Sequence, residues 1–266
     1  MKLYLTVALE AALKAGIEIL KVYGTDFNVE IKGDDSPLTL ADNNANDVIN
    51  SYLRPTNIPI ISEENRQLPY VDRKSWNRCW IVDPLDGTKE FIKRNGEFTV
   101  NIALVEEGVP VLGVIYVPVS KTLYFTSIDK TSKKITLDSE DVSVEEIYEK
   151  AFQITPQPII DVVKVVGSRS HLNEDTERFI SKIEEKNKVE IVSMGSSLKF
   201  CMVAEGLAHI YPRFAPTMEW DTAAGHAICR AVGVEVVDQT TGTQMKYNKP
   251  NLLNNHFMVG SAINVV

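Results

Sequence analysis

The sequence predicts a layered α/β fold, and three observations support this prediction. Strand-like apolar runs alternate with helical patterns between residues 162 and 237. Two β-rich runs, 98–105 and 109–117, are separated by a short acidic turn that ends in glycine. An amphipathic helical pattern covers residues 3–23, where leucine or isoleucine recurs at intervals of three or four. Helices and strands that alternate along a chain pack as layers around shared apolar cores.

The N-terminal region is predicted to begin with two helices. The first covers residues 3–23, and the second covers 39–53 and stops before Pro55. Short apolar runs follow at 59–62 and 79–82, and acidic residues come directly after both of them. We interpret these runs as buried strands.

The C-terminal region is predicted to alternate strands with helices. Strands are expected at 162–166, 189–192, 209–211 and 234–237, and helices at 173–185, 196–205 and 221–232. Residues 127–160 are weakly patterned and are the best candidate for a boundary region. We therefore predict two α/β subdomains, which cover residues 1–150 and 151–266.

The composition is that of an ordinary globular protein with an acidic charge balance. The chain has 266 residues, of which 44% are hydrophobic and 24% charged, and its formal net charge is −8. These values exclude a disordered chain and argue against a nucleic-acid binder, because such proteins usually carry a basic surface. An acidic protein can still bind a small phosphate where local cations override its overall field.

The cysteines and the apolar runs bear on the expected location. Cys79, Cys201 and Cys229 are odd in number and have no C-x-x-C spacing, so we predict buried thiols rather than disulfides or a zinc site. No apolar run approaches the ~18–20 residues that cross a bilayer, and charges interrupt any signal-peptide core. We therefore expect a cytoplasmic protein without an integral membrane segment; peripheral association with the inner membrane stays open.

The segment 83–88, Asp-Pro-Leu-Asp-Gly-Thr, is the strongest candidate for a functional motif. Its two aspartates lie three residues apart around a proline, so a tight turn can direct both carboxylates and the Leu85 carbonyl at one point. Carboxylate and carbonyl oxygens are the ligands that Mg²⁺ prefers. Gly87 would let a phosphate approach the backbone, and the Thr88 hydroxyl would handle a water.

Each acidic position also has an ordinary explanation. The segment 83–88 could be a surface turn with capping aspartates, Glu63 and Glu64 could be solvated, and Asp221 could be the N-cap of the helix that follows it. Together, however, the three positions lie at ends of apolar runs, where open α/β folds place their ligand groups. Their combination favours a site for a hard cation.

Two segments resemble signatures of the inositol monophosphatase superfamily. Residues 80–91, Trp-Ile-Val-Asp-Pro-Leu-Asp-Gly-Thr-Lys-Glu-Phe, resemble the first signature, and residues 220–225, Trp-Asp-Thr-Ala-Ala-Gly, resemble the second. The variant Gly-Thr-Lys-Glu-Phe, together with Gly-Ser-Arg-Ser-His at 167–171 and Gly-Ser-Ser-Leu-Lys-Phe at 195–200, is similar to the 3′(2′),5′-bisphosphate nucleotidase branch. The resemblance extends over nearly the whole chain and implies a five-layer αβαβα sandwich.

The resemblance implies roles for individual residues. Two or three Mg²⁺ ions would be held by Glu63, Asp83, the Leu85 carbonyl, Asp86 and Asp221. The attacking water would be oriented by Asp42, Glu63 and Thr88. Substrate contacts would come from Asp86, Gly87, Thr88, Ser168, Ser170, His171, Ser197, Lys199, Arg213 and Asp221. For His171 and Lys199, an exposed surface position is the alternative.

The implied reaction removes the 3′-phosphate of adenosine 3′,5′-bisphosphate and leaves AMP and phosphate, a step in sulfur assimilation and nucleotide recycling. The partner would be this small nucleotide rather than nucleic acid, and the protein is expected to be a monomer or homodimer. Two alternatives stay open: an inositol or sugar phosphate phosphatase of the same superfamily, and a phosphate-binding regulatory protein without catalysis. All of the implied ligand residues are present, which argues against the second alternative.

Overall fold

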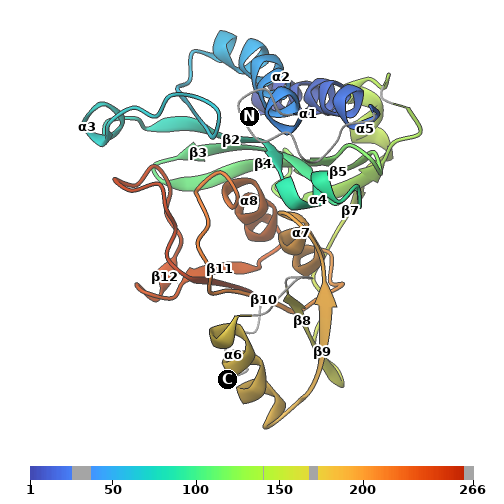
Figure 1. Ribbon diagram of the computed structural model, residues 1–266, viewed down its shortest axis with the longest axis vertical. Coiled ribbons are helices and arrows are strands. Elements are labelled where there is room, and N and C mark those ends of the chain that lie inside the picture. The colour runs from blue at the N-terminus through green and yellow to red at the C-terminus, as the bar shows by residue number, and fades with distance from the viewer. Residues whose placement is uncertain (26–36, 140, 168–172, 261–266) are drawn as a thin grey trace.

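The computed structural model describes residues 1–25, 37–139, 141–167 and 173–260. Within these ranges the chain forms two sheets with helices between them and on their outer faces (Figure 1). The helices are α1 (Lys2–Tyr23), α2 (Pro37–Leu53), α3 (Tyr70–Arg73), α4 (Thr88–Ile92), α5 (Val144–Lys150), α6 (Glu174–Glu184), α7 (Leu198–Ala204) and α8 (Ala223–Ala231), with the 3₁₀ turn η1 at Arg54–Thr56.

The first sheet has the strand order β1-β2-β3-β4-β5-β6-β7. Its strands are β1 (Ile60–Ser62), β2 (Arg78–Asp86), β3 (Thr99–Glu106), β4 (Val109–Val117), β5 (Thr122–Thr126), β6 (Ser132–Thr136) and β7 (Phe152–Gln153). The pair β1–β2 is parallel, and the other neighbours are antiparallel. Ser62 at the carboxyl end of β1 pairs with Val82, which places the residues after β1 beside Asp83 in β2.

The second sheet has the strand order β12-β11-β13-β10-β8-β9. Its strands are β8 (Val162–Gly167), β9 (Lys188–Ser193), β10 (Ile210–Arg213), β11 (Glu235–Asp238), β12 (Thr243–Gln244) and β13 (Phe257–Gly260). The strands β10, β8 and β9 run parallel, and β13 runs antiparallel to both β10 and β11.

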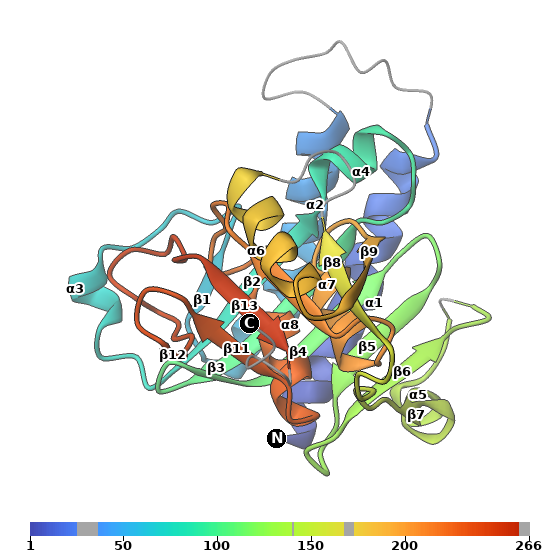
Figure 2. The same cartoon turned by 90° about the horizontal axis from the view of Figure 1, so that it is seen from below.

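The helices complete five layers. Helices α1 and α2 pack on each other and on β2, β3 and β4, on the face of the first sheet away from the second (Figure 1). Helices α7 and α8 lie between the sheets: α8 contacts β3, β4 and β11, and α7 contacts β8, β10 and β13. Helix α6 packs against β9 on the outer side of the second sheet (Figure 2). The order of layers is therefore αβαβα.

Three apolar cores separate these layers in the described part of the chain. The first lies between α1, α2 and the first sheet and includes Trp80 and Tyr116; the second surrounds α7 and α8 and includes Phe200 and Phe257. The third lies between the second sheet and α6 and includes Ile180. Helix α8 can approach β4 closely because Gly113 has no side chain: a Cβ there would lie 2.3 Å from the Ala224 carbonyl oxygen. The three cysteines are buried and free, as predicted.

The predicted layered α/β fold is confirmed, with one difference along the chain. The weakly patterned region 127–160 contains β6, α5 and β7, which complete the edge of the first sheet. Its pattern is weak because β6 has only two buried positions, at Ser132 and Ile135, and one of them is polar. The division into subdomains at residue 150 stays a prediction. In the ranges that the structure describes, no helix is both long and apolar enough to span a membrane.

Candidate active site

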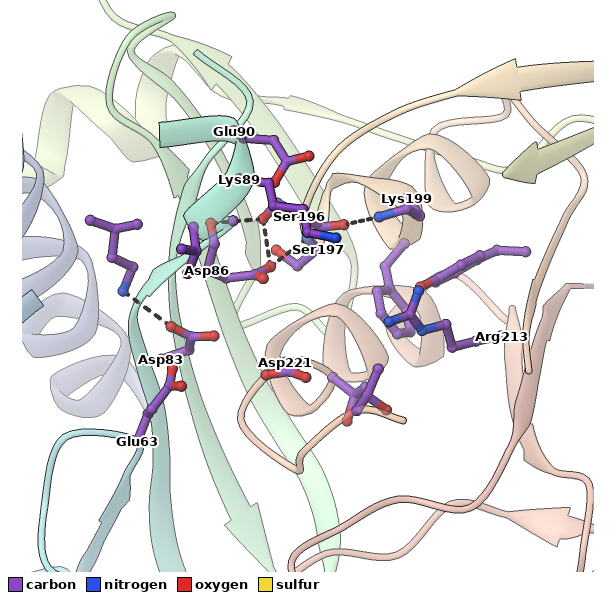
Figure 3. Close-up of a pocket in the computed structure, with 17 residues that line it drawn as sticks. Glu63, Asp83, Asp86, Lys89, Glu90, Ser196, Ser197, Lys199, Arg213 and Asp221 are labelled. Atoms are coloured by element: carbon purple, nitrogen blue, oxygen red, sulfur yellow. Dashed lines mark hydrogen bonds between the residues drawn. The ribbon is translucent and has the colours of Figure 1, made fainter. Parts of the chain in front are cut away.

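A cleft with a volume of about 340 Å³ is lined by elements of both sheets and by the helices between them (Figure 3). It brings together many of the residues that the sequence singled out. These are Glu63, Asp83, Leu85, Asp86, Gly87, Thr88, Ser197, Lys199, Arg213 and Asp221. Asp42 lies near this set on α2 but does not line the cleft, and Ser168, Ser170 and His171 lie outside the described residues.

The segment 83–88 is a bulged strand end rather than the tight turn that we expected. Strand β2 continues through Asp83 to Asp86, and its pairing with β3 shifts register between these two residues. A bulge redirects side chains locally, so both aspartates line the same cleft. The Asp83 side chain is only 1% exposed, which excludes the alternative of a solvent-exposed turn.

Gly87 connects the end of β2 to α4 and needs to be glycine. Its φ of +105° is in a region that other residues rarely adopt. A Cβ at this position would also lie 3.2 Å from the Phe98 Cα and 3.3 Å from the Ser196 Cβ. The close approach of Ser196 brings α7, which carries Lys199, against the end of β2.

The carboxylates of Glu63, Asp83 and Asp86 form one side of the cleft, which we call the acidic wall (Figure 3). Burial raises the pKa of Asp83 well above its ordinary value, and the negative charges of Asp86 and Glu63 raise it further. The Glu63 side chain reaches solvent at the rim, yet partial desolvation, followed by the charges of Glu64 and Asp86, raises its pKa to about 7. Without a positive charge nearby, the ionised form of these carboxyl groups is therefore unfavourable.

Asp221 and Asp42 experience the same excess of negative charge. Burial, and then the charge of Asp86, raises the pKa of Asp221 to about 7. Burial, and then the charges of Glu64 and Glu63, raises the pKa of Asp42 to about 8. Asp221 is not the N-cap of α8, because that position belongs to Thr222 and the Asp221 carboxylate instead accepts a bond from the Met218 N–H at 2.8 Å.

The donor atoms of the acidic wall are oxygens, which suit a hard cation. As the side chains stand, however, no three His, Cys, Asp or Glu residues within the described ranges converge as a metal-ligand group. The carboxylates are close enough to raise one another's pKa values but do not meet at one point.

Sequence reasoning assigned Ser197 to the substrate and did not single out Ser196, Asn101 or Thr99, which also hold Asp86 or its partners. Its Oδ2 atom accepts hydrogen bonds from the Ser196 hydroxyl, from the Ser197 N–H at 2.6 Å and, more weakly, from the Asn101 amide at 3.4 Å. The hydroxyl of Thr99 contacts the hydroxyls of both serines, at 2.6 and 2.9 Å. Strand β3 and the start of α7 therefore fix one oxygen of Asp86 from two sides.

Lys199 and Arg213 form the opposite side of the cleft, which we call the cationic wall (Figure 3). Lys199 is 8% exposed, so it is not a helix-surface lysine; its ammonium donates to the Ser196 carbonyl oxygen at 2.9 Å. Burial lowers the pKa of Lys199 to about 8, although Asp86 counteracts this shift. Arg213 donates to the Pro216 carbonyl oxygen at 3.2 Å.

The buried carboxylate of Glu219 anchors the segment that carries Asp221. Glu219 is fully buried and accepts bonds from the N–H groups of Asn248 and Lys249 at 2.6 and 3.0 Å, and from the Lys249 ammonium at 2.6 Å. Arg73 in α3 in turn donates to the Asn248 side chain. The sequence could have suggested this anchor only through the presence of Glu219, because its hydrogen-bond partners are distant along the chain.

Comparison with known proteins gives concordant results. The model of the inositol monophosphatase family matches residues 1–263. The 3′(2′),5′-bisphosphate nucleotidase CysQ of Salmonella typhimurium is 44% identical over 254 residues, which cover 94% of this chain and 96% of that protein. Its namesake in Escherichia coli strain K12 is 44% identical over 233 residues, which cover 86% and 88%.

Solved structures agree in fold. The crystal structure of CysQ from Bacteroides thetaiotaomicron, described as a bacterial member of the inositol monophosphatase family, superimposes with a TM-score of 0.88 at 50% identity, and the match covers 96% of this chain and 95% of that one. An inositol monophosphatase from Zymomonas mobilis has a TM-score of 0.73 at 20% identity, with 96% and 91% covered, and shares the fold.

Proposed function

Because this chain belongs to the inositol monophosphatase family, we propose that it is a Mg²⁺-dependent 3′(2′),5′-bisphosphate nucleotidase. It would hydrolyse the 3′-phosphate of adenosine 3′,5′-bisphosphate and leave AMP and phosphate. The observation that carries the proposal is the pairing of an acidic wall and a cationic wall across one cleft. The first suits a metal ion, and the second suits the phosphate groups of a substrate with two of them.

The residues of the acidic wall, together with Asp221 and the Leu85 carbonyl, fit a divalent cation. Glu63, Asp83, Asp86 and Asp221, with the Leu85 carbonyl, would hold it, and all of these donors are hard oxygens. Raised pKa values at Glu63, Asp83 and Asp221 support this assignment, because buried carboxylates that repel one another need a positive charge nearby. When bound, the ions would lower the pKa of a water and offset charge on the phosphoryl group.

Water is the expected nucleophile. The three cysteines are buried and none lines the cleft. The hydroxyls of Ser196 and Ser197 line it, but they bond to Asp86, Thr99 and Asn101. We assign Asp42, Glu63 and Thr88 to orient the attacking water, with a carboxylate of this group accepting its proton.

The cationic wall would hold the part of the substrate that does not react. Lys199 and Arg213 lie on α7 and β10, across the cleft from the acidic wall (Figure 3). A buried ammonium and a guanidinium bind phosphate oxygens through charge-assisted hydrogen bonds. The second phosphate would therefore select nucleotide bisphosphates over monophosphates such as inositol 1-phosphate.

Phosphate release by the purified protein tests the proposal. Adenosine 3′,5′-bisphosphate, inositol 1-phosphate and fructose 1,6-bisphosphate should be compared side by side, each with Mg²⁺ and with EDTA. We expect preferred turnover of the adenosine compound, lost with EDTA and in the Asp86→Asn variant. Preferred turnover of inositol 1-phosphate would overturn the substrate, and no turnover by folded protein would overturn the enzymatic role.

A further inference from the structure

A network of neutral side chains joins α2 to the turn after β1, next to the acidic wall. It consists of Ser62, Asn46, Asn50 and Asn65, and we call it the amide network. The Asn65 Oδ1 atom accepts bonds from the Asn46 and Asn50 amides at 3.0 and 3.1 Å, and the Asn65 amide donates back to Asn50 at 3.2 Å. The Ser62 hydroxyl donates to the Asn46 Oδ1 atom at 2.7 Å.

Three of the four residues in the amide network are buried at positions where apolar side chains are the ordinary choice. Ser62 on β1 is 0% exposed. Asn50 and Asn46 are 3% and 7% exposed and lie on α2, whose other buried positions include Ala45 and Ile49. Burying polar groups costs free energy unless they are hydrogen-bonded. Because these groups satisfy one another, the network holds one geometry that apolar side chains would leave less defined.

The position of the network relates it to the candidate site. Asn46 lies four residues after Asp42, one helical turn along the same face of α2. Ser62 and Asn65 directly bracket Glu63 and Glu64. None of the network residues lines the cleft. The network therefore ties together the two backbone segments that carry Asp42 and Glu63, without touching a substrate in the cleft.

The neutrality of the network matters as much as its geometry. A lysine in this place would pair with the carboxylates and reduce their charge, and a further carboxylate would add to the repulsion that already raises their pKa values. Asparagine and serine provide directional bonds with no net charge. They can fix the carboxylates without competing with them for a cation.

We propose that the amide network is a positioning device, which fixes the separation of Asp42 on α2 and Glu63 after β1 so that the two carboxylates act together on the attacking water. The inference rests on the proposed function, in which these carboxylates orient that water and Glu63 also holds a metal ion.

Two buried serines allow a matched test. Ser62 and Ser132 are both 0% exposed, and each hydroxyl donates one bond, Ser62 at 2.7 Å to Asn46 and Ser132 at 2.8 Å to the Ile228 carbonyl oxygen. Ser132 lies on β6 and does not line the cleft. Ser62→Ala and Ser132→Ala therefore remove equivalent bonds, one inside the network and one remote from it.

Steady-state kinetics with saturating Mg²⁺ gives the first readout. We expect Ser62→Ala to lower kcat by about 10- to 100-fold, the usual effect of losing a residue that orients a metal-site ligand. KM for adenosine 3′,5′-bisphosphate should stay within about twofold, because the cationic wall is unchanged. Ser132→Ala should lose similar thermal stability and keep its kcat.

Calorimetric titration with Mg²⁺ in the absence of substrate gives a readout that does not depend on turnover. We expect Mg²⁺ binding to weaken by about tenfold in Ser62→Ala and to stay unchanged in Ser132→Ala. Equal kcat and Mg²⁺ affinity in the two serine variants would overturn the inference. If Ser62→Ala does not fold, Asn65→Ala replaces it in the test, because Asn65 lies at the partly exposed end of the network. Its kcat and Mg²⁺ affinity are then compared with those of Ser132→Ala.

The proposed function and the inference fail in different ways. Asp42→Asn and Glu63→Gln should each lower kcat if their carboxylates orient the water. If both variants retain full activity, that assignment is wrong and the inference falls with it. If both lose activity while Ser62→Ala and Asn65→Ala retain it, only the inference is wrong.

Discussion

The acidic wall and the cationic wall of the cleft are built in different ways. The acidic wall comes from adjacent strands of the first sheet: Glu63 follows β1, and Asp83 and Asp86 lie in β2 (Figure 3). The cationic wall comes from two separate elements, with Lys199 on α7 and Arg213 on β10. The acidic wall is therefore formed mostly by one bulged strand end. The cationic wall forms only when α7 packs on the second sheet.

The two walls also differ in the ligand they require. Burial and mutual repulsion raise the pKa values of the acidic wall, whereas burial lowers the pKa of Lys199. In each wall the ionised form of the side chains is unfavourable. A bound group of opposite charge would stabilise it: a metal ion at the acidic wall and a substrate phosphate at the cationic wall. Substitutions in the acidic wall should therefore lower the catalytic rate, and substitutions in the cationic wall should weaken substrate binding.

The largest effect is expected from Asp83→Asn, which breaks the acidic wall at its most buried carboxylate. We expect phosphate release to fall by about 10²- to 10³-fold, because the site loses one of the charged groups that would stabilise the transition state through the metal. The protein without Mg²⁺ should become more stable, since one repelling buried charge is removed. Its melting temperature should rise by about 2–4 °C for each kcal/mol of repulsion relieved.

Asp161→Asn provides the control for this prediction, because Asp161 is exposed and outside the cleft. The same chemical change there should alter neither activity nor melting temperature in EDTA. Retained activity in Asp83→Asn would show that the acidic wall does not serve catalysis. A lower melting temperature in EDTA would show that its carboxylates stabilise the fold.

A smaller and different effect is expected from Lys199→Met, which breaks the cationic wall. Methionine fills similar space but cannot make the charge-assisted bond to a phosphate, whose loss costs about 1.5–3 kcal/mol. We expect KM for adenosine 3′,5′-bisphosphate to rise by about 10- to 100-fold with little change in kcat. Initial-rate kinetics over a range of substrate concentrations measures both constants.

Lys188→Met serves as its control, because Lys188 is exposed on β9 and does not line the cleft. It should leave both constants unchanged. A fall in kcat without a change in KM for Lys199→Met would contradict the division of labour between the walls. Lys199 would then belong with the catalytic residues.

The difference between the walls also explains which parts of the site can be predicted from the sequence. The acidic wall is encoded mainly in one short segment, so the spacing of Asp83 and Asp86, combined with acidic residues at the ends of other apolar runs, is enough to suggest it. The predicted helices and strands have the correct type because their apolar periodicities are strong. The prediction of a turn at 83–88 is wrong, since a proline and a glycine indicate turns and bulges alike.

The contacts that hold the site cannot be predicted in this way. Ser196 bonds to Asp86 across 110 residues of chain, and Asn248 bonds to Glu219 across 29. Along the chain, Asn46 is only one polar residue on a helix; its role depends on Ser62 and Asn65, which the fold brings next to it. No local pattern specifies a partner at such separations, because the partner depends on how the layers pack.

A pH dependence of stability is also expected, with one sign for the carboxyl groups of Asp42 and Asp221 beside the acidic wall and the opposite sign for Lys199 of the cationic wall. The folded-state pKa values of Asp42 and Asp221, about 8 and about 7, lie above those of unfolded carboxyls. Their contribution to stability is present at low pH and is lost as pH rises through 7 and 8. Lys199, with a pKa of about 8, loses its proton in the folded state first, so its contribution to stability rises above pH 8.

Urea unfolding in EDTA between pH 5 and 10 measures both slopes. We expect the free energy of unfolding to fall up to about pH 8, by as much as about 1.4 kcal/mol per pH unit for each carboxyl group, and then to recover above pH 8 as folded Lys199 loses its proton. Asp42→Asn should flatten the descending limb, and Lys199→Met should remove the recovery above pH 8. Saturating Mg²⁺ should abolish the descent, because the carboxylates then ionise against a cation. A stability that rises from pH 5 to 8 in EDTA would mean that these carboxyls are already neutralised by the protein, and the contrast between the two walls would disappear.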